Sequence, residues 1–197
     1  MLKKKYFLII IALIIFAINP LYAIEKANIT PVMGQKIKIA TTILQQKDLN
    51  ATTKADKVFS LLDDVFDYQL MARLSLGKET WSKINAGEKK EFIDKFVKYL
   101  KHSYIAKLNL YTDEKLTIVG AKEINAQRIW LVTELIGAQD TYEITYKFYK
   151  AKNNDWLIYD VDIIGVSLIQ TYIAQFSDIL KEKPFSALLH KLEIKSK

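Results

Sequence analysis

Residues 156–176 constrain the fold of this chain most, because they change from strand to helix with almost no loop between. The first half has the two-residue period of a β-strand. Its apolar positions Leu157, Tyr159, Val161 and Ile163 alternate with Ile158, Asp160 and Asp162. Gly165 then breaks the strand, and Ser167 stands where a helix N-cap would. Apolar residues recur beyond it at helical spacing, so we expect a helix that folds directly back from the strand end.

The segments before this point are predicted to be helical. Residues 28–46, 54–66 and 68–81 carry apolar side chains at three- and four-residue steps. Asn85 is followed three residues later by Glu88, which is the pattern of a capping box. We therefore expect Asn85 to open the long amphipathic helix that follows it.

Strand-like segments occupy the middle of the chain. They span residues 116–124, 129–136, 142–148 and 157–163, with hairpin-type turns at 137–140 and 152–155. The strict alternation of the third segment indicates an antiparallel strand with one buried face. After residue 167 the pattern is helical again, interrupted at Pro184. The order predicts an α+β fold, with several helices packed on one face of a four-stranded antiparallel sheet.

The N-terminus has the pattern of a cleaved secretory signal. Lys3, Lys4 and Lys5 precede an apolar run over residues 6–18, and a small residue, Ala23, ends the segment. We predict a signal peptide over residues 1–23 and a single domain over residues 24–197. The alternative is an uncleaved anchor, although about 13 apolar residues are few for a span of roughly 20. The chain has no cysteine for a lipoprotein anchor.

The net charge of the chain indicates which classes of molecule it could bind. The net charge is +7, and without residues 1–23 it falls to about +4, because 26 basic residues then face 22 acidic ones. Such an excess favours anionic membrane surfaces or acidic lipid head groups by diffuse attraction, but it also fits an ordinary solvated surface rich in lysine. An exported chain without a base-reading motif is not expected to bind nucleic acid.

The sequence offers little for catalysis. Its two histidines, His102 and His190, do not have a metal-ligand spacing. Asp160 and Asp162 share one face of the predicted strand, about 6.5–7 Å apart. Paired carboxylates can do acid–base work, but we expect these two to be solvent-exposed or to bind a turn. We expect neither enzymatic activity, nor a metal site, nor a cofactor.

Two blocks of the sequence resemble a known family. The first is Tyr159-Asp-Val-x-Ile-x-Gly-Val-Ser-Leu with Tyr172 and Gln175-Phe176 after it. The second is Phe66-Asp-Tyr-x-x-Met-Ala-x-x-x-Leu-Gly-x-x-x-Trp81. Both are similar to blocks of the MlaC family, the periplasmic phospholipid-binding proteins of ABC transport systems, also called toluene-tolerance auxiliary components. Many relatives have Arg where this chain has Ile173, so any contact of that Arg is in doubt here.

The resemblance implies a monomeric phospholipid carrier in the periplasm. Such a carrier moves lipid between an outer-membrane lipoprotein–porin complex and an inner-membrane ABC transporter with its substrate-binding subunit, which maintains outer-membrane lipid asymmetry. Phospholipid is then cargo and not a cofactor. By the same resemblance the acyl chains lie in an apolar cleft between the helices and the sheet. The residues expected to line it are Tyr68, Met71, Leu74, Phe96, Leu100, Tyr104, Tyr146, Phe148, Ile163, Val166 and Tyr172.

Two other functions stay open at this point. The apolar faces could all be core, in which case the protein is a periplasmic adaptor that binds a partner without lipid. Alternatively, Asp160, Asp162 or His102 could serve a small hydrolase or isomerase. Composition alone does not distinguish a filled core from a lipid slot.

Overall fold

The computed structural model describes residues 24–109, 111 and 113–194. The predicted signal peptide, residues 1–23, lies outside the described residues. The helices are η2 (Lys26–Asn28), α2 (Ile29–Gln45), α3 (Ala51–Leu62), α4 (Tyr68–Leu76), α5 (Lys78–Lys83), α6 (Ala86–Asn109), α7 (Leu168–Glu182) and α8 (Phe185–Lys191). The strands are β1 (Lys115–Asn125), β2 (Arg128–Ile136), β3 (Thr141–Lys150), β4 (Trp156–Ile163) and β5 (Val166–Ser167).

The strands form one antiparallel sheet in the order β1-β2-β3-β4-β5. The α+β class is confirmed, but the predicted number of strands was wrong, because the described residues form five strands and not four. The fifth is the two-residue β5, which pairs with the end of β4 through Asp162↔Ser167 and Ile163↔Val166. It arises from the tight turn at Ile164 and Gly165, where φ is 55° and 74°. The turn brings the chain back beside β4 just before α7 begins.

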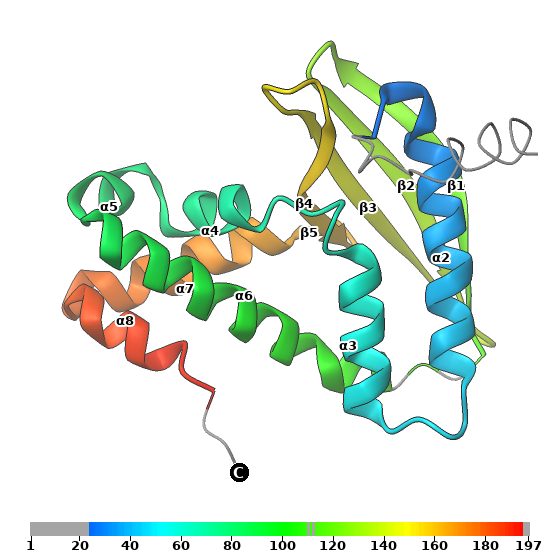
Figure 1. The fold of residues 1–197 in the computed structure, drawn as a ribbon, viewed down its shortest axis with the longest axis horizontal. Coiled ribbons are helices and arrows are strands. Elements are labelled where there is room, and N and C mark those ends of the chain that lie inside the picture. Colours follow the sequence, from blue (N-terminus) through cyan, green and yellow to red (C-terminus); the bar gives the residue numbers. More distant parts are fainter. Residues whose placement is uncertain (1–23, 110, 112, 195–197) are drawn as a thin grey trace, which may run out of the picture.

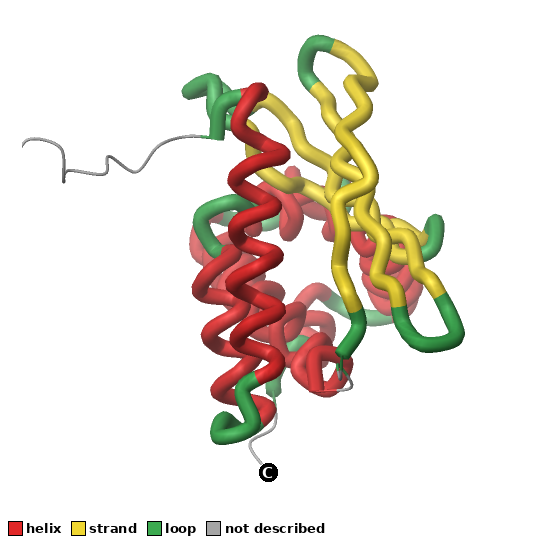
Figure 2. The backbone as a smooth tube through the Cα atoms, turned by 90° about the vertical axis from the view of Figure 1, so that its right-hand side faces the viewer, coloured by secondary structure: helices red, strands yellow, loops and turns green. Residues whose placement is uncertain are grey.

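Helices α2 and α3 cover one face of the sheet. Figure 1 shows α2 in front of the strands with α3 beside it, and Figure 2 shows α2 nearest the viewer, running along the sheet. Under them lies a core whose fully buried members include Met33, Leu131, Phe148 and Ile158. The sheet contributes the inward-facing residues of β2 and β3, which pair as Leu131↔Tyr146 and Ile129↔Phe148.

Helices α4 to α8 form a second layer that extends beyond the β4 edge of the sheet (Figure 1). Its core includes Phe92 and Phe96 of α6 and Phe176 of α7, whose rings meet edge to face at 5.8 and 6.2 Å. The predicted capping box is present, because Glu88 N donates to Asn85 Oδ1 and Asn85 N donates to Glu88 Oε2. Pro184 separates α7 from α8, as its position in the sequence predicted.

Strand β4 does not alternate regularly, contrary to the sequence-based expectation. The pairs Lys147↔Asp160 and Phe148↔Ile158 leave Tyr159 as an extra residue, which is a β-bulge. The bulge shifts the alternation of side chains between the two faces of the sheet by one residue. As a result, Ile158 and Val161 are both buried in the core under α2 and α3. Asp160 therefore lies on the opposite face, next to Lys147 of β3.

The free edge of β4 is occupied by other parts of the chain. Ile24 O accepts a hydrogen bond from Trp156 N, and Val65 O accepts one from Ile158 N. Ile158 O in turn accepts from Asp67 N, which completes a short parallel bridge. With β5 at its end, β4 has partners on both sides along most of its length.

Asp160 anchors the start of α7, so of the two roles expected for it, solvent exposure and turn binding, it has the second. It is 5% exposed. One carboxylate oxygen accepts from Ile169 N in the first turn of α7, and the other accepts from Ser167 Oγ and Lys147 Nζ. Ser167 also caps the helix, since its Oγ accepts from Gln170 N. A carboxylate at a helix N-terminus is favourable because the helix dipole is positive there. The turn-binding alternative for Asp160 is thus the correct one.

Replacing Asp160 with asparagine is expected to destabilise the protein by about 1.5–3 kcal/mol, the usual range for hydrogen bonds to a charged group. Lys147 keeps a partner in Asp162 at 2.9 Å, which limits the loss. Urea denaturation would measure it. Asp178→Asn is the control, because Asp178 and Lys181 form an exposed pair expected to contribute less than about 1 kcal/mol. Equal losses in the two variants would contradict the anchoring role of Asp160.

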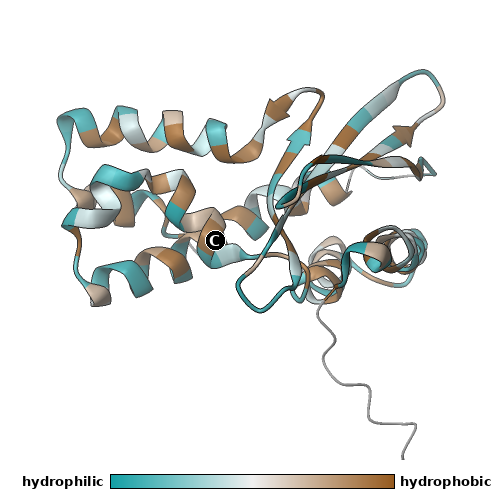
Figure 3. Cartoon of the chain, turned by 90° about the horizontal axis from the view of Figure 1, so that it is seen from above, coloured by the Kyte–Doolittle hydropathy of each residue, from teal (hydrophilic) through white to brown (hydrophobic). Residues whose placement is uncertain are grey.

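No helix among the described residues is both long and apolar enough to cross a membrane. Figure 3 shows the reason, since hydrophobic and hydrophilic positions are interleaved along each helix. The apolar side chains are concentrated on the faces that pack against the sheet or against other helices.

Candidate functional site

The first lobe of an apolar cavity lies between helices α3, α4 and α6 and the inner face of the sheet. It has a volume of about 230 Å³. The residues that line it are Val58, Phe59, Leu62, Phe66, Tyr68, Met71, Leu100, Lys101, Tyr104, Leu108, Ile144, Tyr146, Val161, Ile163 and Leu168. Lys101 is the one charged residue in this lining.

The second lobe, of about 360 Å³, lies between α2, α3, the C-terminal part of α6 and strands β1 to β4, and the charged residues of its lining are Lys36, Lys107 and Glu114. It shares Val58 and Leu62 of α3, Tyr104 and Leu108 of α6, and three sheet residues with the first lobe. The shared sheet residues are Ile144, Tyr146 and Ile163. The two lobes are therefore halves of one apolar cavity roofed by α3, of a size suited to a small-molecule ligand.

The cavity carries hydroxyl groups that stay uncharged. Burial raises the pKa of Tyr146 to about 12 and also raises the pKa of Tyr104. Both phenols are neutral near pH 7, because an ionised oxygen would lose its hydration there. The tyrosines thus add hydrogen-bonding groups to an apolar wall without adding charge.

A polar cluster stands beside the first lobe. Lys101 Nζ lies 2.6 and 2.8 Å from the two carboxylate oxygens of Asp63, and Tyr68 donates its hydroxyl hydrogen to Asp63 at 2.9 Å. Burial, together with the charge of Asp63 and this hydrogen bond, raises the pKa of Tyr68. The Lys101 ammonium also lies over the rings of Tyr68 and Phe59, at 5.1 and 5.8 Å from their centroids.

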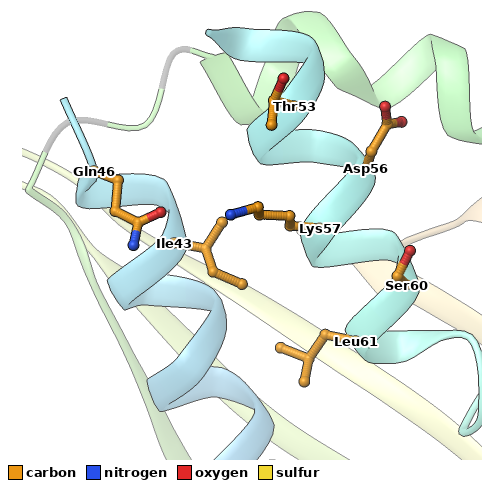
Figure 4. A pocket seen from close by; sticks show the side chains of 7 residues that line it. All are labelled: Ile43, Gln46, Thr53, Asp56, Lys57, Ser60 and Leu61. Carbon is orange, nitrogen blue, oxygen red and sulfur yellow. The ribbon is translucent and has the colours of Figure 1, made fainter. Parts of the chain in front are cut away.

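A groove of about 590 Å³, larger than either lobe alone, lies elsewhere, between the C-terminal half of α2 and α3 (Figure 4). In Figure 4 the side chain of Lys57 extends from α3 toward Ile43 of α2. Most of the lining is polar and includes Gln46, Thr53 and Asp56, with Ile43 and Leu61 as its apolar members. An apolar ligand would gain little from such a surface, so we consider the two-lobed cavity to be the functional site.

Comparison with known proteins gives the family. The family model described as "MlaC protein" matches residues 35–194 of this chain. The chain belongs to the MlaC family. Its fold is also that of a phospholipid-binding protein from Ralstonia solanacearum, solved in complex with a phospholipid. The two have a TM-score of 0.71 at 19% sequence identity, over 86% of this chain and 95% of that one. No curated protein has a significantly similar sequence.

Six of the residues predicted from the MlaC resemblance line the cavity. They are Tyr68, Met71, Leu100, Tyr104, Tyr146 and Ile163. They come from α4, α6, β3 and β4, so the fold brings together side chains that are far apart in the sequence. Their contact with lipid stays a prediction.

The other five predicted residues lie outside both lobes. Phe96 and Tyr172 are buried in the core between α6 and α7, with ring centroids 5.3 Å apart, and Leu74 packs against that core. Phe148 is fully buried in the core under α2 and α3. Val166 follows the tight turn and is 61% exposed. Leu74, Val166 and Tyr172 lie within the two family blocks, whereas Phe96 and Phe148 lie outside them. The neighbours of all five are core residues or solvent.

Helix α3 supplies cavity residues that the sequence reasoning missed. Val58 and Leu62 line both lobes, and Phe59 lines the first, as does Phe66 in the segment that follows α3. The signal for them was the helical stripe in residues 54–66, which indicated one buried face but not what that face would contact. From α2, Met33 and Ile37 line the second lobe, although this region shows no resemblance to the family blocks.

The residues considered for catalysis do not face the cavity. Asp160 and Asp162 share Lys147 as their partner, at 3.1 and 2.9 Å, on the opposite face of the sheet. His102 is exposed on α6. Among the described residues there is no group of three His, Cys, Asp or Glu side chains that could hold a metal ion. The arrangement around the cavity is suited to burying a hydrocarbon, and it brings none of these three candidates to it.

Proposed function

We propose that this MlaC-family protein is a phospholipid carrier that holds acyl chains in the two-lobed cavity. The observation that carries the proposal is the cavity itself, whose first lobe combines fourteen uncharged side chains with a single cation. Burying one CH₂ group is worth about 0.8 kcal/mol, so a lipid tail would be held firmly in such a lobe. An adaptor that binds a partner without lipid would have no need of this space.

Family membership and the phospholipid-bound relative of the same fold support this proposal. We further propose that the protein is exported by its N-terminal segment and works in the periplasm as a monomer. There it would pass phospholipid between an outer-membrane lipoprotein–porin complex and an inner-membrane ABC transporter with its substrate-binding subunit. The carrier would contribute to outer-membrane lipid asymmetry and would have no catalytic step.

Purification of the full chain from the periplasm of an expressing bacterium tests the proposal. We expect phospholipid to stay with the protein through native mass spectrometry and to be recovered by solvent extraction. After delipidation, the protein should take up lipid again from phospholipid vesicles. Protein that carries no lipid and takes none up from vesicles would contradict the carrier function and favour the adaptor.

A further inference from the structure

We propose that Lys101 binds the phosphate of the lipid and that Asp63 is its partner only while the cavity is empty. This inference rests on the proposed carrier function and assigns the residue that recognises the head group. Its starting point is the position of Lys101 in α6, where it is the only charged side chain lining the first lobe. The two other lysines of the cavity, Lys36 and Lys107, line only the second lobe, where Lys36 is paired with Asp64 at 2.7 Å and Lys107 lies over the ring of Tyr104. A phosphodiester at the first lobe would therefore meet Lys101 as the cation of that lining.

The surroundings of Lys101 hold its ammonium group at the edge of the lobe. The rings of Tyr68 and Phe59 lie under it at 5.1 and 5.8 Å, which is cation–π distance. Aromatic rings attract an ammonium group but do not neutralise it. The side chain is 27% exposed, so one side of the ammonium group remains accessible to an anion arriving with lipid.

Asp63 is a partner of Lys101 that a lipid phosphate can replace. Its side chain is 42% exposed, so water can hydrate its carboxylate when Lys101 turns to a phosphate. Tyr68 would continue to donate its hydroxyl hydrogen to Asp63 after the exchange. The carboxylate would repel the incoming phosphate, so it weakens binding as well as neutralising Lys101 in the empty state. A carrier must also release its cargo, and this competition makes release easier.

Binding of two lipids that differ only in the phosphate head group tests this inference. The probes are phosphatidylglycerol and diacylglycerol with the same acyl chains, added to the delipidated full-length protein. We expect Lys101→Met to weaken phosphatidylglycerol binding roughly 10- to 100-fold, the equivalent of a hydrogen bond to a charged group. Diacylglycerol binding should be unchanged, and Lys101→Arg should restore phosphatidylglycerol binding. Lys90→Met is the matched control, because Lys90 lies on the same helix in an exposed pair with Asp94.

Asp63→Asn gives a second test that does not depend on the folding of Lys101→Met. We expect it to strengthen phosphatidylglycerol binding and to slow its release, with no change for diacylglycerol. The inference would be overturned if each variant changed the binding of both lipids equally. It would also be overturned if neither variant changed the binding of either lipid. Those outcomes leave the carrier function standing if the wild-type protein binds lipid. Failure of the wild-type protein to bind either lipid would contradict the carrier function itself.

Discussion

Replacing Ile144 with tryptophan is expected to abolish phospholipid binding while the protein stays folded. Ile144 lies on the inner face of β3 and lines both lobes of the cavity. An indole ring at this position would occupy the space that acyl chains need in either lobe. Enlarging a side chain in a filled core costs about 1–3 kcal/mol, but here the added atoms enter an existing cavity, so the cost should be at the low end.

The measurement for Ile144→Trp is the amount of phospholipid extracted per protein, with circular dichroism to confirm folding. Val119→Trp is the control, because Val119 is also a β-branched residue of the sheet but is 59% exposed on β1. This control should retain the lipid load of the wild type. If Ile144→Trp retained the same load, the two-lobed cavity would not be the lipid site.

Replacing Phe96 with alanine is expected to lower the free energy of unfolding by about 3–5 kcal/mol, the usual cost of removing a buried aromatic side chain. Phe96 is fully buried and contacts the rings of Phe92, Tyr172 and Phe176. Its loss would leave a void between α6 and α7 that the surrounding helices could fill only in part. Urea denaturation of delipidated protein should be used, because bound lipid would itself raise the apparent stability.

Phe59→Ala is the matched comparison for Phe96→Ala. Phe59 is half-buried and lines the first lobe, so its removal should cost clearly less stability but weaken lipid binding. A core residue and a cavity residue can thus be told apart. Phe96→Ala should cause the larger loss of stability, and Phe59→Ala should cause the loss of lipid binding. A loss of under about 1 kcal/mol for Phe96→Ala, the typical cost of an average substitution, would show that Phe96 is not a core residue.

Local features of the fold could be predicted from the sequence because short-range geometry determines them. The Asn85–Glu88 capping box and the Ser167 cap depend on residues three positions apart, and both are present. The bulge at Tyr159 was missed, because the alternation of apolar residues continues through it unbroken in the sequence. The shift becomes visible only when β4 is paired with Lys147 and Phe148 of β3.

The cavity was less predictable because it depends on how two layers meet. Phe96 and Leu100 lie one helical turn apart on the same stripe of α6 and both belong to the buried core, yet only Leu100 also lines the first lobe. Periodicity identifies the stripe but not the point where the facing helices diverge from the sheet. The polar cluster of Asp63, Tyr68 and Lys101 was missed for a similar reason, since its members come from three separate segments.

The paired edge of β4 has a consequence for the order in which the chain can fold. Ile24, the first described residue, and Val65, which follows α3, bond to Trp156 and Ile158, about 130 and 90 residues later in the sequence. Such long-range pairings form late and slowly, because a large loop must close before any bond is gained. The beginning of the domain therefore has no partner on this edge until most of the chain has been synthesised. A chain that ends before Trp156 would be unable to form any of these bonds, so the edge is completed only when the sequence through Ile158 is present.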